Sequence, residues 1–259
     1  MLPFSTFSLA AGVGLIGGLT SGLCGVSPGG ALVVLATLSG AEQHVAQGIS
    51  LTAQIPPTSL SGIKRYREEG SACPTRWLLW LAPGFLLGGV AGATLATRAS
   101  TSVLQWSYVG YLAALDALLL VRSSAGRDSA AAANSTEDIP ALGLLAVGLL
   151  AGVSSGYLGI GGGLAIVAGL AGGLRVPQHQ AQMVSLVLSI IPTTIPAAWV
   201  YWRAGKLPSW PIIVAAIVGL WLGTDLGARA ANRMKPTTPR RLLLTMVTAM
   251  VAYMVWRAL

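Results

Sequence analysis

The chain has 259 residues, of which 54% are hydrophobic and only 9% are charged, and its net charge is +8. Soluble domains carry about 25% charged residues, so the composition argues strongly against an ordinary soluble globule. The basic residues lie in short clusters between apolar stretches, which is typical of a multi-pass membrane protein and not of a nucleic-acid-binding surface. Two cysteines without a CxxC motif support neither a disulfide framework nor a cysteine zinc site.

Eight apolar segments follow one another along the chain and are predicted to be helical. They cover roughly residues 4–39, 44–63, 77–97, 103–121, 139–174, 178–202, 209–228 and 242–258. A helix that crosses the bilayer needs about 20 residues, so most of these segments match one crossing. The first and fifth segments are too long for a single crossing. Each is predicted to be a helix, an unwound Gly-rich elbow and a further half-length helix.

Glycines and prolines mark where the long segments break. The first elbow is predicted at Gly25–Gly30 and the second at Gly159–Gly163. The second and sixth segments are interrupted by Pro56-Pro57 and by Pro192 with Pro196. Unwound backbone inside a bilayer is tolerated only where it is buried in protein or lines a watery cavity. The breaks are therefore the best candidates for a binding site.

The chain repeats itself after about 135 residues. His44–Leu51 reappears as His179–Leu186, and glycines before and after this stretch recur at nearly the same offset. The repeat predicts a first membrane unit at residues 1–122, a polar linker at 123–138 and a second membrane unit at 139–259. A duplicated apolar chain whose hydrophobic runs are broken by glycine and proline indicates a secondary transporter.

Charge indicates how the two units are oriented. If each elbow returns the chain to the side where it started, each unit makes three net crossings and the second unit is inverted. One side then collects twelve basic residues, namely Lys64, Arg65, Arg67, Arg76, Arg122, Arg127, Arg175, Arg229, Arg233, Lys235, Arg240 and Arg241. The other side keeps Arg98, Arg203, Lys206 and Arg257. The asymmetry predicts an inverted repeat with both termini outside the cytoplasm. Tryptophans near segment ends are expected to anchor the chain at the membrane surface, namely Trp77, Trp106, Trp199, Trp202 and Trp256.

The helices that restart after the two elbows are predicted to bind an anion. Their first N–H groups are free, and the helix dipole places positive charge at the same end. The residues expected at this site are Ser27, Gly29, Gly30, Gly161, Gly162 and Gly163. In the alternative reading, the glycines only allow helices to pack closely, as small residues do in membranes.

A polar stripe without charge lies next to the predicted elbows. Gln47, Ser50 and Gln54 share one helix face because their spacings are three and four. Their partners in the repeat are Gln182, Ser185 and Ser189, and Thr58 and Thr193 follow the proline breaks. Neutral donors of this kind can bind a small anion weakly enough to release it. The alternative is hydrogen bonding between helices.

The ionisable residues within the apolar segments are few. His44 and His179 begin the repeated helices, and in inverted units they would lie toward opposite membrane faces, so a shared metal site is not expected. Asp225 is expected to pair locally with Arg229, four residues later. Asp116 has no basic partner at helical spacing and is the candidate for proton coupling.

With these features together, the chain resembles the sulfite exporter TauE/SafE family of bacterial membrane permeases. The resemblance rests on Gly156–Leu164, which looks like the Gly-rich signature of the family, and on Ala181–Leu186 with its counterpart Ala46–Leu51. The first-half counterpart of the signature departs from it at Ser27-Pro28. The resemblance implies export of sulfite or organosulfonates across the inner membrane.

The sequence therefore predicts an all-α, multi-pass transporter of the bacterial inner membrane that exports small sulfur-containing anions by alternating access. Its expected partners are the anionic substrate and the lipid bilayer, with a homodimer as the candidate assembly, and no cofactor, metal or nucleic acid is expected. Export without coupling and export coupled to protons both remain open. The competing readings are an anion channel and a permease for another small anion or solute. A membrane enzyme is not expected, because the Ser154-Ser155 motif has no histidine at membrane depth.

Overall fold

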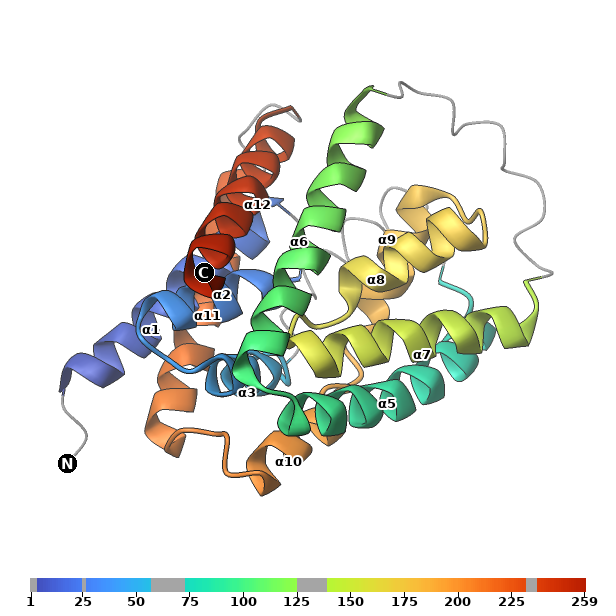
Figure 1. Cartoon of the computed structure of the whole chain (residues 1–259). Coiled ribbons are helices and arrows are strands. Elements are labelled where there is room, and N and C mark those ends of the chain that lie inside the picture. Colours follow the sequence, from blue (N-terminus) through green and yellow to red (C-terminus); the bar gives the residue numbers. More distant parts are fainter. Residues whose placement is uncertain (1–3, 25–26, 57–72, 125–138, 232–236) are drawn as a thin grey trace.

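The computed structural model describes residues 4–24, 27–56, 73–124, 139–231 and 237–259. Within these ranges the chain is helical and has no strand, which confirms the all-α class predicted from the sequence (Figure 1). The side chains of some residues within helices, among them Asp116, Gln178 and His179, lie outside this description, as does the whole of Thr58.

The helices fall into two groups along the chain. The first half contains α1 (Phe4–Cys24), α2 (Gly29–Leu38), α3 (Gln43–Ala53), α5 (Thr75–Arg98) and α6 (Thr101–Ser124). The second half contains α7 (Ala141–Leu158), α8 (Gly163–Ala168), the π-helical turn η2 (Gly169–Gly173), α9 (Gln178–Leu188), α10 (Ile195–Arg203), α11 (Trp210–Ala231) and α12 (Thr237–Ala258). Helix α6 continues two residues into the predicted linker.

Helix length separates two classes of element. Among the described residues, three helices are long and apolar enough to cross a membrane, at Thr75–Arg98, Ala141–Leu158 and Trp210–Ala230. Helices α2, α3, α9 and α10 have only 9 to 11 residues. At 1.5 Å per residue, helices of this length span about 14–16 Å, which is close to half of a hydrocarbon core about 30 Å thick.

Glycines bring α1 and α11 into backbone contact. A Cβ at Gly14, Gly18 or Gly22 would lie only 2.2–2.3 Å from a carbonyl oxygen of α11. The contacted oxygens advance along α11, from Ala216 to Thr224, as the glycines advance along α1, so the two helices run parallel. Only residues without a side chain permit this approach, as in membrane helix pairs with a GxxxG spacing.

Helices α5 and α7 pack in the same way (Figure 1). A Cβ at Gly84, Gly88 or Gly92 of α5 would lie 2.2–2.5 Å from the carbonyl oxygens of Leu145, Leu149 and Val153. The reciprocal glycines on α7 are Gly148, Gly152 and Gly156, which contact Leu81, Phe85 and Gly89. Each pair therefore joins the first long helix of one half to the third membrane segment of the other half.

The chain reverses its direction between α7 and η2. Gly143, near the start of α7, faces Leu174, just after η2. Val147 faces Gly169 at the start of η2, and a Cβ at Gly162 would lie 3.2 Å from the carbonyl oxygen of Ala151. In these contacts, the residue number increases along α7 while it decreases from η2 back to α8. The two segments therefore form an antiparallel hairpin. Residues 141–174 therefore begin and end near the same level of the molecule.

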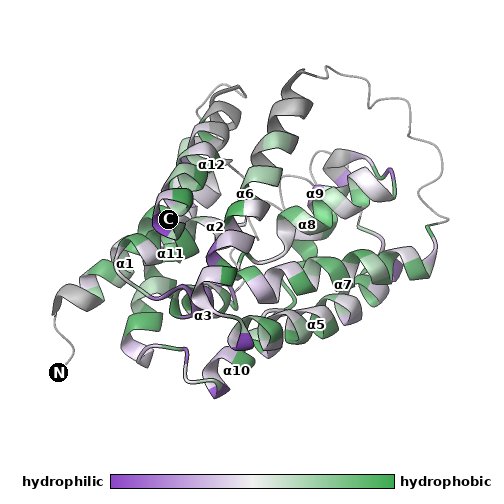
Figure 2. Cartoon of the chain, in the orientation of Figure 1, coloured by the Kyte–Doolittle hydropathy of each residue, from purple (hydrophilic) through white to green (hydrophobic). Residues whose placement is uncertain are grey.

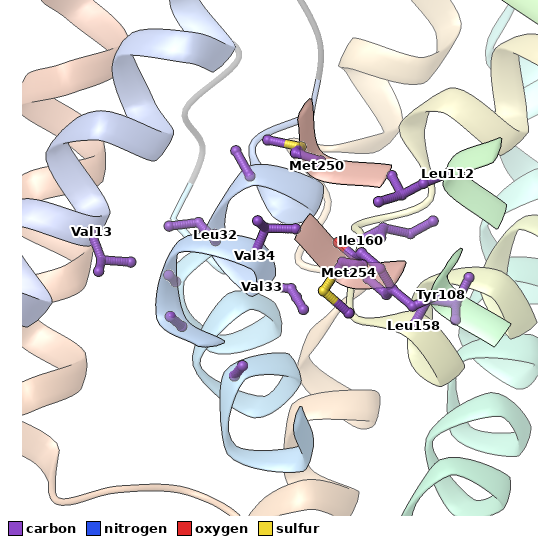
Figure 3. Packing of buried hydrophobic residues seen from close by; sticks show 14 of the residues in the cluster. Val13, Leu32, Val33, Val34, Tyr108, Leu112, Leu158, Ile160, Met250 and Met254 are labelled. Carbon is purple, nitrogen blue, oxygen red and sulfur yellow. The ribbon is translucent and has the colours of Figure 1, made fainter. Parts of the chain in front are cut away.

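The corresponding part of the first half also turns back. Gly17 of α1 contacts Leu32 of α2, so α2 lies against the second half of α1. The buried side chains of α2 then pack against α6, α12 and the start of the α7–α8 break, with Leu32, Val33 and Val34 beside Met250 and Met254 of α12 (Figure 3). Helix α2 is thus enclosed by protein, which an apolar half-length helix requires.

Four chain segments meet at one end of the molecule. The Arg257 guanidinium of α12 donates hydrogen bonds to Thr37 O and to Ala41 O, where α2 ends. His44, at the start of α3, lies against Ala99, just past the end of α5. A Cβ at Gly48 would lie 3.1 Å from Lys206 O, in the loop after α10.

The outer faces of the helices are apolar. Large hydrophobic side chains that face outward include Leu79, Leu87, Leu142, Leu150, Val218 and Trp221. Hydrophilic residues gather at helix ends and in turns (Figure 2). Exposed apolar surface on this scale marks contact with lipid or another hydrophobic partner. Trp106, Trp199, Trp202 and Trp256 are exposed as predicted for surface anchors, but the prediction for Trp77 is wrong, because its side chain is 2% exposed and packs with Leu81 and Phe85.

Candidate functional site

The break between α7 and α8 depends on three glycines with left-handed backbone. Gly159 has φ of 72°, Gly161 of 80° and Gly162 of 62°. Residues with a Cβ rarely adopt the left-handed backbone conformation because the Cβ approaches the following carbonyl oxygen. Gly159 ends α7 and Gly162 begins α8, so the apolar segment is interrupted here by conformations that favour glycine.

The start of α2 packs directly against this break. A Cβ at Gly29 would lie 2.4 Å from the carbonyl carbon and oxygen of Ile160. Ser27, two residues before α2, donates its hydroxyl to Ile160 O at 3.1 Å. A Cβ at Gly163, the first residue of α8, would lie 3.4 Å from the Ser27 Cβ. The structure thus brings together the predicted residues Ser27, Gly29 and Gly163 from opposite halves of the chain.

Both helices begin at this meeting point, where the N–H group of Gly163 already donates to Gly161 O at 2.7 Å. The first helical bond of α2 runs from Leu32 N to Pro28 O, and that of α8 runs from Ile166 N to Gly162 O. The backbone N–H groups before these residues have no acceptor inside the helix. The same ends carry the positive pole of the helix dipole. An anion would be attracted to this point, although every side chain that forms it is uncharged.

The polar face of α3 holds the two breaks together. The Ser50 hydroxyl lies 2.6 Å from Gly159 O and 3.2 Å from Gly29 O, so it bridges the breaks of both halves. Gln54 donates from Nε2 to Ser50 O at 2.9 Å and accepts from the Ser27 hydroxyl at 2.9 Å. The hydrogens of Ser27 and Ser50 are therefore used on protein acceptors.

Helix α9 makes equivalent bonds in the second half. Ser185 donates to Gly163 O at 3.1 Å, as Ser50 does to Gly29 O. Ser189 donates to Ser185 O at 2.9 Å, as Gln54 does to Ser50 O. Each residue that takes part in these bonds lies 134 or 135 positions after its counterpart in the first half. Half-buried Gln182 lies one turn before Ser185 on α9, and buried Thr193 follows the helix.

Gln47 differs from Ser50 and Gln54 because its amide nitrogen has no protein partner. The side chain is fully buried, and its Oε1 accepts a hydrogen bond from the Tyr201 hydroxyl at 2.9 Å. The same hydroxyl lies 3.1 Å from Gly156 O. Nε2 of Gln47 is buried and makes no hydrogen bond. A buried donor without an acceptor is costly, so this nitrogen is the best-supported contact for a ligand.

Two tyrosines at the site were not among the predicted residues. Tyr201 orients Gln47, and the buried Tyr108 donates to Gly30 O at 2.9 Å. The signal for Tyr201 in the sequence is weak and consists of its recurrence as Tyr66 in the repeat. Neither tyrosine stands out by spacing, because each partner comes from a distant part of the chain.

The predicted ionisable residues lie away from this meeting point or outside the description. Asp225 and Arg229 form an exposed ion pair at 2.7 Å, which confirms the local pairing predicted from their spacing. His44 is buried, and its Nε2 lies 3.1 Å from Ala96 O and 3.2 Å from Ala99 O. Both oxygens only accept, so Nε2 carries the hydrogen and binds the carbonyl end of α5. Asp116 belongs to α6. Among the described residues, no three His, Cys, Asp or Glu side chains gather as metal ligands would.

Apolar spans, two broken segments and helix starts that meet at the centre define the architecture of a membrane transport protein. The sequence matches the family described as "Sulfite exporter TauE/SafE" over residues 10–254, so the chain belongs to this family.

Three curated relatives carry compatible names. The chain is 29% identical to the "Probable membrane transporter protein YdhB" of Bacillus subtilis (strain 168), over 84% of this chain and 87% of the relative. It is 31% identical to a "Probable membrane transporter protein" of Xylella fastidiosa (strain 9a5c), over 58% of this chain and 57% of the relative, and to its counterpart in strain Temecula1 over the same shares. No solved structure matches the chain significantly.

Proposed function

We propose that this membrane transporter exports small sulfur-containing anions, such as sulfite or organosulfonates, across the bacterial inner membrane. The observation that carries the proposal is the meeting of two helix N-terminal ends, at Gly29 and Gly163, with a buried and unpaired Gln47 amide nearby. Backbone N–H groups and helix dipoles at broken membrane helices bind anionic groups of transported substrates. The family description supports the sulfur chemistry.

An uncharged site suits a transporter that must release its substrate. A buried Lys or Arg would hold an anion tightly, whereas helix ends and carboxamides attract it with partial charges only. Ser27, Ser50 and Ser185 donate their hydrogens to backbone oxygens at the breaks, and Gln54 and Ser189 donate to the preceding turn of the chain. In the proposed binding site, these residues keep the helix ends in position. Gln47, Gln182 and the free N–H groups contact the anion. The remaining residues of the proposed binding site are Gly30, Gly161, Gly162 and Thr193, and Thr58, which was also predicted, lies outside the described residues.

The proposal includes an inverted repeat with both termini outside the cytoplasm. The segments that carry Arg98, Lys206 and Arg257 meet at one end of the molecule, through Ala99, Gly48 and Thr37. Three of the four basic residues assigned to the outer side by charge thus belong to segments that lie together. The α7–η2 hairpin supports a return of each elbow to its starting side.

Alternating access would move the glycine-packed helix pairs α1–α11 and α5–α7 relative to each other. Each pair combines helices of opposite halves in backbone contact, which makes it a rigid body. The central breaks are held by side-chain hydrogen bonds, such as Ser27 to Ile160 O and Ser50 to Gly159 O. These bonds can exchange for bonds to the substrate more easily than packed backbones can separate.

Transport by the purified protein in liposomes tests the function. We expect saturable uptake of sulfite or of organosulfonates, counterflow when the lumen contains unlabelled anion, and competition between the anions. Flux that rises linearly with concentration and shows no counterflow would favour the channel. No flux for any of these anions, with flux for another solute, would favour the alternative permease and withdraw the substrate class.

A further inference from the structure

We propose that Gln43 of α3 extends the central site toward the outer surface as a second anion-binding station, which shares Gln47 with the central site, and that Tyr201 positions Gln47. This inference rests on the proposed transport function. The station takes a small oxyanion that also carries a hydrogen-bond donor, such as hydrogensulfite or a hydroxylated organosulfonate. The central site described above does not include Gln43.

The two carboxamides are buried without the partners that buried polar groups require. Neither side chain is exposed to solvent. Nε2 and Oε1 of Gln43 both lack a hydrogen-bond partner, and so does Nε2 of Gln47. Most buried polar side-chain atoms in folded proteins have such a partner. Three unpaired atoms on two residues of one helix therefore indicate that something else fills this place.

Gln43 and Gln47 point to the same side of α3. Residues four apart lie one above the other on a helix, with Cβ atoms about 5–6 Å apart. The face continues toward the centre through Ser50 and Gln54, where donors and acceptors bond to protein. Gln47 itself lies against the second break, because a Cβ at Gly159 would lie 2.8 Å from the Gln47 Cα, whereas Gln43 lies one helix turn farther from the breaks.

The position of Gln43 places the station beside one surface of the membrane in the proposed orientation. Eleven residues separate Gln43 from Gln54, which is about 16 Å along a helix and half of a hydrocarbon core. Gln54 contacts the central breaks, whereas Gln43 begins α3 at the end where Ala41 binds Arg257. This is the outer end by the charge argument, so an exported anion would reach Gln43 after the centre.

The chemistry of the station selects for a ligand that both accepts and donates. Tyr201 donates to Gln47 Oε1, which leaves the two hydrogens of Nε2 for an acceptor. Gln43 adds a second amide nitrogen and also an oxygen that needs a donor. An oxyanion with an O–H or N–H group satisfies all three atoms, whereas an oxyanion without one leaves Gln43 Oε1 unpaired.

The sequence repeats this pair in its second half. Gln43-His44-Val45-Ala46-Gln47 corresponds to Gln178-His179-Gln180-Ala181-Gln182, with both glutamines retained. Nε2 of His44 binds the carbonyl end of α5, whereas its buried Nδ1 has no hydrogen-bond partner.

The test compares Gln43→Met with Thr52→Val in the full-length protein in liposomes. Methionine keeps the size of glutamine and removes both unpaired groups. Thr52 lies on the same helix, and its buried hydroxyl donates to Gly48 O within that helix, so Thr52→Val controls for a lost polar group. Uptake of 2-hydroxyethanesulfonate and of methanesulfonate would be measured together with the melting temperature of each variant.

We expect Gln43→Met to raise KM for 2-hydroxyethanesulfonate about tenfold, the effect of one lost hydrogen bond to a charged ligand, and to raise KM for methanesulfonate less. Its melting temperature should stay the same or rise, because an apolar group replaces unpaired polar atoms. Thr52→Val should leave both KM values unchanged. An unchanged KM, or a lower melting temperature with equal effects on both anions, would overturn the station.

A second variant keeps the inference testable if Gln43→Met does not fold. Gln43→Glu has the same shape but adds a negative charge where the anion should pass, so KM should rise further than in Gln43→Met. An unchanged KM in this variant also overturns the station. Absence of flux for both anions in the unmodified protein would instead contradict the proposed function itself.

Discussion

The glycine interfaces of the long helix pairs and the glycines of the central breaks serve different physical needs. In α1–α11 and α5–α7, the glycines have helical backbone and are required because a backbone oxygen of the neighbouring helix occupies the place of a Cβ. At Gly159, Gly161 and Gly162, the backbone is left-handed. Glycine at the interfaces produces rigid contact, whereas glycine at the breaks interrupts a helix and frees its N–H groups.

This difference indicates which parts of the molecule bind and which parts only support. Among the described residues of these four helices, the one buried polar atom without a partner is Ser155 Oγ on α7. The breaks carry free N–H groups, and the polar face of α3 beside them contains the unpaired Gln47 nitrogen. Substitutions should therefore separate the two regions: those at the interfaces should affect stability first, and those at the breaks should affect transport.

The largest effect is expected from Gly18→Ala in the α1–α11 interface. The new Cβ would lie 2.3 Å from Leu220 O, so the helices must move apart and lose packing. Overpacking of this kind costs about 1–3 kcal/mol or more, which lowers the melting temperature by several degrees in a chain of this size. Thermal unfolding of the purified protein measures the effect.

Gly12→Ala on the same helix is the matched control. No atom lies within 4 Å of a Cβ at Gly12, and alanine favours the helix by up to about 1 kcal/mol. Its melting temperature should be unchanged or higher. Equal losses for Gly18→Ala and Gly12→Ala would contradict the close contact between α1 and α11.

A substitution at the second break should reduce transport as well as stability. In Gly161→Ala, the Cβ would collide with Gln54 Oε1, and the φ of 80° disfavours alanine. Gly205→Ala isolates the backbone effect, because Gly205 has φ of 67° and no atom within 4 Å of a Cβ. Strain alone costs about 1–2 kcal/mol.

The comparison between these two variants is the informative measurement. We expect both to lose some stability, and we expect only Gly161→Ala to lose most of its anion uptake in liposomes. If Gly205→Ala reduces uptake equally, the effect belongs to backbone strain in general and not to the geometry of the break.

The sequence predicts one of these regions better than the other. Hydrophobic runs identify helices because burial in lipid or protein requires them, and the all-α class follows from this pattern alone. Glycines at a spacing of four, such as Gly14, Gly18 and Gly22, indicate a close helix contact, but nothing in the pattern states that the partner is α11. A contact between opposite halves depends on tertiary structure.

The details of the site depend even more on the folded state. Spacing places Gln47, Ser50 and Gln54 on one face, yet it cannot show that the Ser50 hydrogen is used on carbonyl oxygens while the Gln47 nitrogen has no acceptor. Sequence position likewise places His44 at the start of a helix near a membrane surface, but it does not show what the side chain binds. The side chain is buried because the carbonyl end of α5 provides its partners, 52 and 55 residues away.

A smaller effect is expected when Gln47 loses its orientation. Tyr201→Phe removes the donor to Gln47 Oε1 and should raise KM for sulfite about three- to tenfold, while Gln47→Ala should raise it about tenfold by removing the free donor. Gln182→Ala should weaken transport in the same direction. Initial rates of uptake at several sulfite concentrations measure these changes.

A double mutant distinguishes an orienting role of Tyr201 from a direct one. Because Tyr201 is proposed to act through Gln47, the effects of Tyr201→Phe and Gln47→Ala on KM should not add. Additive effects would show that the two side chains contribute independently. Unchanged flux in both Gln47→Ala and Gln182→Ala would remove the polar faces of α3 and α9 from the site.

The smallest effect on rate is expected from Asp116→Asn, in a region that neither glycine interfaces nor breaks include. A carboxylate within an apolar segment is energetically costly, so its presence there indicates a function. We propose proton coupling as the function of Asp116. Asparagine has nearly the same shape but cannot exchange a proton near neutral pH, so the variant should transport without responding to an imposed pH gradient. The unmodified protein should respond if export is coupled to protons. Equal pH profiles for the two proteins would remove Asp116 from the mechanism and leave the uncharged centre as a site for transport without proton coupling.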